Sequence, residues 1–215
     1  MIRTTPSWVP FNKKKIAQSA ADFVASGSDG DSEALTATFQ QFLNVAEAGC
    51  LDYTAPANRP RATEACAFMI RMSLPTDYWN KPRWHRDGRM YSCSCAGGGD
   101  HNPHSKFAVA LLGPPTLLLK PSEFISDVFA HPDMIQDRSW DKLAREFASC
   151  ERFIFRTGEI YRFSWGQEDS PVHSEPGSSN SHRVVVMLNF GSEEEIWDQC
   201  RNWKSDYDHY RPTDS

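Results

Sequence analysis

Two kinds of hydrophobic spacing divide this chain into a helical beginning and a strand-rich remainder. Apolar side chains recur every three or four positions in residues 13–26 and again in residues 33–50, a spacing that predicts two amphipathic helices. The turn-forming segment 27–31 separates them. A helix with one apolar stripe usually packs on a neighbouring sheet, so we expect both helices to cover one. The apolar positions are Ile16, Ala20, Phe23, Val24, Leu35, Phe39, Phe42 and Leu43.

From Ala65 onward, short apolar segments alternate with turn-forming residues. Several short strands with Gly and Pro between them are typical of a β-sandwich or barrel. One helical segment, residues 132–150, interrupts the strands, and residues 96–105 and 166–181 have the composition of loops. The expected strands cover residues 66–74, 84–87, 90–94, 107–112, 116–119, 153–155, 159–163, 172–174 and 183–190.

The length of 215 residues fits one domain, residues 1–215, and is long enough to bury a core without covalent cross-links. We expect residues 1–60 to form a helical N-terminal extension, residues 65–192 the β-rich core, and residues 204–215 a polar tail. The six cysteines are sparse for this length, and we expect them to be free thiols.

Net charge and apolar run length argue against two classes of partner. The formal net charge is −5, whereas nucleic-acid binding needs a basic face. The longest apolar run, residues 107–119, is interrupted by Gly113, Pro114 and Pro115 and is too short to cross a bilayer. We therefore expect a soluble, cytoplasmic protein without a nucleic-acid or membrane partner. The oligomeric state stays open.

The segment PRWHRDG, residues 82–88, carries the most informative polar pattern. Residues i and i+2 of a strand share a face, so His85 and Asp87 would present an imidazole and a carboxylate side by side while Arg86 points away. A second imidazole from a distant strand would complete a 2-His-1-carboxylate face, the arrangement of non-haem iron(II) oxygenases. An H-x-D pair alone is a weak signal, so this interpretation needs a second element.

His173 and Arg183 supply that element. His173 precedes Arg183 by ten residues, and Arg183 opens the run VVVML, which is apolar on both strand faces and so predicts a buried strand. A cation at the start of a buried strand needs a counter-anion. Arginine suits this role for a dicarboxylate co-substrate, because its planar fork binds a carboxylate through two hydrogen bonds and stays charged when desolvated.

These motifs resemble the signature of the iron(II)/2-oxoglutarate-dependent oxygenases. The pattern WH-x-DG is followed about ninety residues later by H-x(9)-R at the head of a strand, and GEIYRF matches the strand that usually precedes the distal histidine. The resemblance covers residues 84–190 and leaves the N-terminal residues and the tail unmatched. It implies a mainly β fold with helices: a double-stranded β-helix (jelly roll) core, with the N-terminal helices packed on its major sheet.

The resemblance also implies roles for individual residues. His85, Asp87 and His173 would be the ligands of Fe(II), and Arg183 would bind the C5 carboxylate of 2-oxoglutarate. Members of the family often add a hydroxyl or a second cation at that carboxylate. The candidates here, in order of preference, are Thr116, Lys106 and Tyr91.

The implied reaction consumes O2 and 2-oxoglutarate, releases succinate and CO2, and oxidises a C–H bond of the substrate. Hydroxylation, desaturation and ring closure all stay open, although Asp87 argues against a halogenase, which needs a small residue there. Arg183 is not followed by the N-x-T that a nucleic-acid demethylase would carry. We expect a small-molecule substrate, an amino acid or another carboxylate. The alternatives are a catalytically inactive jelly-roll module that binds metal or ligand, and a zinc hydrolase with Glu175 as its nearby carboxylate.

A few other residues near the motifs have competing interpretations. His182 is the rival of His173 as distal ligand, but as the neighbour of Arg183 it would point to the opposite face of the sheet. By the same alternation, Trp84 should pack in the core. Trp79 and Trp165 are candidates for the substrate wall, and Arg71, if it faces inward, for holding a substrate carboxylate.

Overall fold

The computed structural model describes residues 9–75, 80–87, 104–130, 140–165, 170–177, 181–193 and 196. The chain divides into two compact units, each built from three segments of the sequence. The first unit holds Met1–Arg3, Arg71–Arg89 and Ala108–Val186, and the second holds Thr4–Ile70, Met90–Phe107 and Met187–Ser215. None of the described helices combines the length and the apolar character that crossing a membrane requires.

The second unit begins with two helices whose ends follow the sequence prediction closely. Helix α1 (Lys13–Ser26) starts at Asn12, whose side chain accepts a hydrogen bond from the Lys15 amide, and helix α2 (Ser32–Asp52) starts at Asp31 in the same way. Nine residues, from the predicted pattern and its neighbours, form the buried side of the pair. They are Ile16, Ala17, Ala20, Ala21, Phe39, Phe42, Leu43, Ala46 and Cys50.

Helix α2 packs on a sheet through aromatic contacts. Phe39 and Phe42 both meet the ring of Phe68 edge to face, with ring centroids 5.8 and 6.4 Å apart. Gly49 of the same helix lies against Phe107, leaving no room for a Cβ without a shift of that ring. In this unit the strand order is β1-β2-β8-β3. The strands are β1 (Val9–Pro10), β2 (Ala65–Ser73), β8 (Arg183–Gly191) and β3 (His104–Leu112), with short helices η1 (Pro56–Asn58) and α3 (Arg59–Ala62) between β1 and β2 in sequence.

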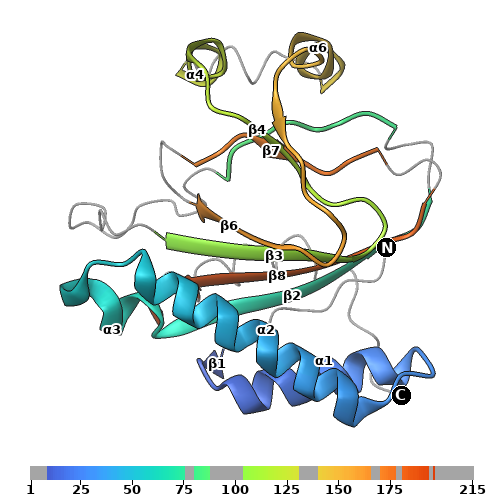
Figure 1. The fold of residues 1–215 in the computed structure, drawn as a ribbon, viewed down its shortest axis with the longest axis vertical. Helices are drawn as coiled ribbons and strands as arrows, with labels where there is room; N and C mark the ends of the chain where they lie inside the picture. The colour runs from blue at the N-terminus through green and yellow to red at the C-terminus, as the bar shows by residue number, and fades with distance from the viewer. Residues whose placement is uncertain are drawn as a thin grey trace. The chain divides into compact units, whose positions relative to one another are not determined.

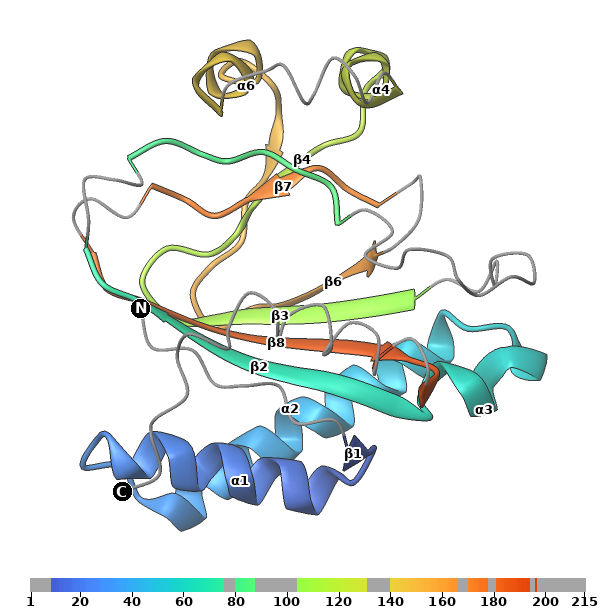
Figure 2. The ribbon, with the colours of Figure 1, turned by 180° about the vertical axis from the view of Figure 1, so that it is seen from behind.

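The boundary between the units falls within β2, β3 and β8, so the first unit holds the remaining part of each strand. Here the order is β2-β8-β3-β6, with β6 (Ile160–Trp165) beside β3. Figure 2 shows β8 between β2 and β3.

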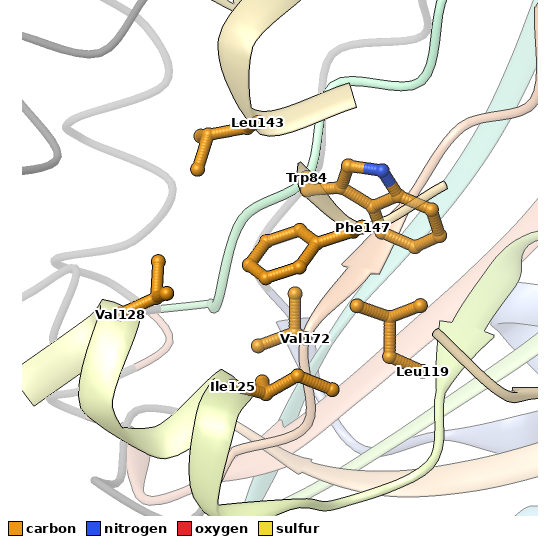
Figure 3. Packing of buried hydrophobic residues seen from close by; sticks show 7 residues of the cluster. All are labelled: Trp84, Leu119, Ile125, Val128, Leu143, Phe147 and Val172. Carbon is orange, nitrogen blue, oxygen red and sulfur yellow. The ribbon is translucent and has the colours of Figure 1, made fainter. Parts of the chain in front are cut away.

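A second, three-stranded sheet completes the first unit. Its order is β5-β4-β7, all antiparallel, formed by β5 (Arg152–Phe153), β4 (Leu117–Leu119) and β7 (His173–Ser174). Helices α4 (Glu123–Ala130) and α6 (Trp140–Glu146) lie next to this sheet (Figure 1). The core between them is a tight cluster in which Trp84 and Phe147 meet edge to face at 6.3 Å (Figure 3). The cluster comprises Trp84, Leu119, Ile125, Val128, Leu143, Phe147 and Val172.

The structure therefore contains antiparallel sheets with helices, which is compatible with the predicted mainly β fold with helices. Strands lie at most of the predicted positions, but residues 84–87 contribute only an isolated bridge at His85. Within the predicted helix 132–150, the described part forms α6 over Trp140–Glu146. Helix α4 was not predicted, because its eight residues are too few for a clear hydrophobic period. The predicted strand 90–94 and the tail 204–215 lie outside the described residues.

Candidate metal centre

The two histidines of the predicted triad are brought together by their own backbones. His85 and His173 form an antiparallel bridge in which each donates its amide N–H to the carbonyl of the other, at 2.9 Å in both directions. Residues opposite each other across such a bridge project to the same side. Their imidazole rings accordingly lie with centroids 4.4 Å apart. Because β7 also pairs with β4, the segment around His85 extends the small sheet by one position.

Asp87 joins the histidines through the two-residue spacing that the sequence predicted. Its Oδ1 lies 3.4 Å from Nε2 of His173 and 3.8 Å from Nε2 of His85. One ligand atom from each of the three residues lies within 4.8 Å of the other two, so this group could bind a metal ion. Two ligand atoms that are each about 2.1 Å from a metal and at right angles to each other are about 3 Å apart. The distances from the Asp87 oxygen to the two Nε2 atoms would therefore have to shorten by only about 1 Å or less.

Hydrogen bonds set the tautomer of both imidazoles. Nδ1 of His85 lies 2.7 Å from the carbonyl oxygen of Arg83, and Nδ1 of His173 lies 3.0 Å from that of Pro171. A carbonyl oxygen can only accept, so each Nδ1 carries a proton. In the neutral ring, Nε2 then holds the lone pair, and it is Nε2 that faces Asp87. Imidazoles that ligate metals are typically oriented by such a bond from the other ring nitrogen.

The triad is buried on one side and accessible on the other. Asp87 and His173 are 7% and 4% exposed, whereas the side chain of His85 is 42% exposed. Buried ligands keep a fixed geometry, and the accessible histidine leaves a side from which a metal and small molecules can enter. The donor set of two imidazoles and one carboxylate suits Fe(II) with open coordination positions.

A buried cation lies in the same unit, at the start of β8. Arg183 is 4% exposed, and it donates hydrogen bonds of 2.9 Å to the carbonyl oxygen of Pro114 and to Oγ1 of Thr116. The turn before these acceptors requires Gly113, which has φ +75° and where an added Cβ would clash with the carbonyl oxygen of His182. The sequence prediction that Thr116 accompanies Arg183 agrees with this geometry.

Arg183 has no carboxylate partner among the described residues, since both of its acceptors are neutral. Burial lowers the pKa of its guanidinium to about 10, and Tyr161 opposes this shift. Burial also raises the pKa of Tyr161, against the opposing effects of Thr116 and Arg183. The buried phenol oxygen of Tyr161 has no hydrogen-bond partner in the described part of the chain. A guanidinium and two hydroxyls thus lie near one another, and all three can donate a hydrogen bond to a carboxylate.

Tyr161 is a site residue that the sequence analysis missed. It lies on β6 two positions before Phe163, so both rings project from one face and stack at 6.2 Å. Phe163 in turn contacts the ring of His173, with centroids 4.8 Å apart. A row of aromatic rings therefore runs from the candidate metal ligand His173 to Tyr161, which lies near Arg183. The GEIYRF motif could have indicated Tyr161, since strand alternation places it on the side of Phe163.

The other predicted residues have different positions. Lys106 is buried on β3 in the second unit, and Tyr91 lies outside the described residues, so their assignment to the carboxylate site stays a prediction. His182 is exposed, and the structure places His173 rather than His182 beside Asp87. Trp84 is 1% exposed in the core cluster, as alternation predicted. Trp79 and the side chain of Trp165, the two candidates for the substrate wall, lie outside the described part.

No protein-family model matches this chain, and no curated protein matches it. Among solved structures, a crystal structure of EvdMO1 is similar, with a TM-score of 0.34 and 17% identity over 59% of this chain and 26% of that chain. The chain thus spans about a quarter of the length of that structure. A likeness this weak carries no argument, so functional inference rests on the geometry of the site.

Proposed function

We propose that this protein is an Fe(II)- and 2-oxoglutarate-dependent dioxygenase that oxidises a C–H bond of a small metabolite and releases succinate and CO2. One observation carries the proposal. A 2-His-1-carboxylate group lies in the same unit as a buried arginine that has no carboxylate partner in the described part of the chain, and a row of aromatic rings lies between them. A keto acid with a distal carboxylate suits both groups, since its keto-acid end would bind the metal and its distal carboxylate would bind Arg183.

In this proposal His85, Asp87 and His173 hold the metal. Bound Fe(II) would supply the activation of O2 for the oxidative decarboxylation of 2-oxoglutarate. The protein contributes the geometry: the carbonyls of Arg83 and Pro171 hold each Nδ1–H, so both Nε2 lone pairs stay directed at one point. The burial of Asp87 and His173 keeps water from competing on that side.

Arg183 would bind the C5 carboxylate of 2-oxoglutarate, assisted by the hydroxyls of Thr116 and Tyr161. A bound carboxylate supplies the counter-charge that the buried guanidinium lacks among the described residues, and it offers an acceptor to the Tyr161 hydroxyl. The negative charge would also raise the pKa of the Arg183 guanidinium back toward its ordinary value. We retain Lys106 and Tyr91 as less favoured candidates for this carboxylate site.

The proposal includes a double-stranded β-helix (jelly roll) core in one domain, with a cytoplasmic location and a small-molecule substrate. Two antiparallel sheets, with the candidate metal ligands on the small sheet and its bridge, support this architecture. The zinc-hydrolase alternative has less support. It needs a general base, and the nearest candidate, Glu175, already binds the guanidinium groups of Arg71 and Arg83.

An anaerobic titration tests the proposal. Fe(II) is added to the purified protein, followed by 2-oxoglutarate, and the visible spectrum is monitored for the weak charge-transfer band of the iron–keto-acid chelate. We expect the band in the wild type and in His182→Ala, which changes the exposed histidine, and not in His173→Ala. Absence of the band in the wild type, or its survival in His173→Ala, would contradict the assigned site. Succinate formed under air then reports turnover.

A further inference from the structure

The bridge between His85 and His173 also determines the next pair of side chains on the same face. Two residues before His85 is Arg83, and two residues after His173 is Glu175, so an antiparallel register places them opposite each other. The observed ion pair agrees with this: Nη2 of Arg83 donates to Oε2 of Glu175 at 2.6 Å. Side chains two residues apart on a strand are separated by about 7 Å, so this pair adjoins the metal ligands.

A second guanidinium reaches the same carboxylate. Arg71, near the end of β2, pairs with Oε1 of Glu175, while Arg83 takes Oε2. Both oxygens of Glu175 are thus engaged by arginine. The three side chains are 18%, 28% and 25% exposed, in the order Arg71, Arg83 and Glu175, so they are half-buried and less screened than surface pairs.

The arrangement suits recognition of an anion. A guanidinium presents its N–H donors as a planar fork that matches a carboxylate, so two guanidiniums held together beside the candidate metal ligands form a group of the kind that binds organic acids. Because Glu175 holds both groups in place, less conformational entropy is lost when they bind a ligand.

We infer that Arg71 and Arg83 bind a carboxylate of the primary substrate, and that Glu175 positions them. This inference rests on the proposed function, because it is the adjacent metal ligands that make the cluster part of a substrate site. The substrate class is then a small organic acid or amino acid, held by its carboxylate while another part of the molecule lies toward His85 and His173. The site is distinct from that of Arg183, which would take the co-substrate.

Saturation-transfer NMR on the metal-free protein tests this inference without turnover. The probes are the L-amino acids, short 2-hydroxy acids and simple aryl carboxylic acids, each paired with its primary carboxamide. We expect at least one acid to receive saturation and its amide to bind about tenfold or more weakly, since a charge-assisted hydrogen bond is worth about 1.5–3 kcal/mol. Arg71→Gln and Arg83→Gln should each abolish this preference. Lys120→Gln, which removes an exposed cation paired with Glu151, is the matched control.

The positioning role of Glu175 is tested by the affinity for the acid in a separate variant. Glu175→Gln should keep the preference for acid over amide but weaken the affinity of the acid several-fold, because both cations remain without their orienting carboxylate. A merely structural ion pair would lower stability and leave the affinity of the folded protein unchanged. The triple variant Arg71→Gln/Arg83→Gln/Glu175→Gln removes all three charges together, so loss of the preference there cannot be attributed to an uncompensated Glu175.

Three outcomes would overturn the inference: equal binding of acids and amides, no binding of any acid, or an unchanged preference in both arginine variants. The proposed function is measured separately, as succinate formed from Fe(II), 2-oxoglutarate and O2 by the wild type. If succinate forms while the arginine variants keep their preference, only the assignment of Arg71 and Arg83 fails. If acids bind through these arginines but the iron chelate never forms, the dioxygenase proposal fails and the carboxylate site stands.

Discussion

The two faces of the bridged segments around His85 and His173 have opposite chemistry. One face carries the candidate metal ligands and the ion pair of Arg83 with Glu175, while the other carries Trp84 and Val172, which are buried in the core cluster (Figure 3). Arg86, on the same side as Trp84, lies over the ring of Phe129 at 5.2 Å. Both sets of side chains extend from the same backbone. Packing of the apolar side chains in the core therefore also fixes the positions of the polar side chains.

In these two short segments, the side chains of one face contribute to folding stability and those of the other face form the candidate site. The core face removes apolar area from water, which is the main favourable term in folding. The groups on the polar face contribute little to the free energy of folding without a ligand, and one of them, His85, is partly exposed. The predictions below separate these two contributions, beginning with the largest change in free energy.

Phe147→Ala should have the largest effect, and it should act on the core face alone. Phe147 is 0% exposed and contacts Trp84, so its truncation should lower the free energy of unfolding by about 3–5 kcal/mol. Urea denaturation of the metal-free protein measures this. The folded fraction should still bind Fe(II). A change below about 1 kcal/mol would show that the cluster does not support the bridged segments.

Asp87→Ala should affect the polar face alone. Loss of a ligand should weaken Fe(II) binding by about 100-fold or more, since even substitutions of partners outside the ligand set cost 10–100-fold. Anaerobic titration measures the affinity, and the exposed Asp127→Ala on α4 is the matched control. If the free energy of unfolding without metal fell as far as in Phe147→Ala, the two faces would not be separable in the way proposed.

Arg183→Gln should weaken 2-oxoglutarate binding by about 10- to 100-fold while Fe(II) binding survives, because one or two charge-assisted hydrogen bonds of about 1.5–3 kcal/mol are lost. The ligand-free variant should not be less stable than the wild type, since it loses a buried cation without a carboxylate partner among the described residues. An unchanged 2-oxoglutarate requirement would remove Arg183 from its role.

The pH dependence of the same interaction gives a further check with a definite sign. Burial lowers the pKa of Arg183 in the ligand-free protein to about 10. Deprotonation on raising the pH through about 10 removes the charge, so affinity for 2-oxoglutarate should fall there and not in Arg183→Gln. Above that pH, and below the ordinary pKa of arginine, the unfolded chain binds more protons at this group, so its contribution to folding stability rises with pH.

Tyr161→Phe and Thr116→Val should have the smallest effects. Each removes one neutral hydroxyl, worth about 0.5–1.5 kcal/mol, so the dissociation constant for 2-oxoglutarate should rise about 2- to 12-fold. Tyr161→Phe also removes a buried oxygen that has no hydrogen-bond partner among the described residues, so the ligand-free protein should gain or keep stability. Calorimetric titration with the metal-loaded protein measures both. No change in either variant would leave Arg183 as the sole carboxylate anchor.

Local spacing was sufficient for much of this site. The alternation of a strand predicts His85 and Asp87 on one face and Trp84 on the other, and the hydrophobic period of α1 and α2 is equally clear in the sequence. Arg183 at the head of a two-sided apolar run indicated a buried cation. These inferences depend only on neighbours along the chain, and the structure contains the corresponding geometry.

Other features depend on pairing between distant segments. Tyr161 beside Thr116 and Arg183 was missed, and short helix α4 was not recognised, because each is determined by what packs against it. The ion pairs of Glu175 were equally invisible, since its partners lie 92 and more residues away in sequence.

The sequence by itself determined which side chains share a face, because strand and helix periods are local and require no knowledge of the fold. Only the tertiary structure decided that His173, and not His182, lies opposite His85, and that both Nε2 atoms point at Asp87. The physical reason is register. Pairing two distant strands one residue out of step would turn every side chain to the other face, and the packing of Trp84 and Val172 in the core selects the register observed.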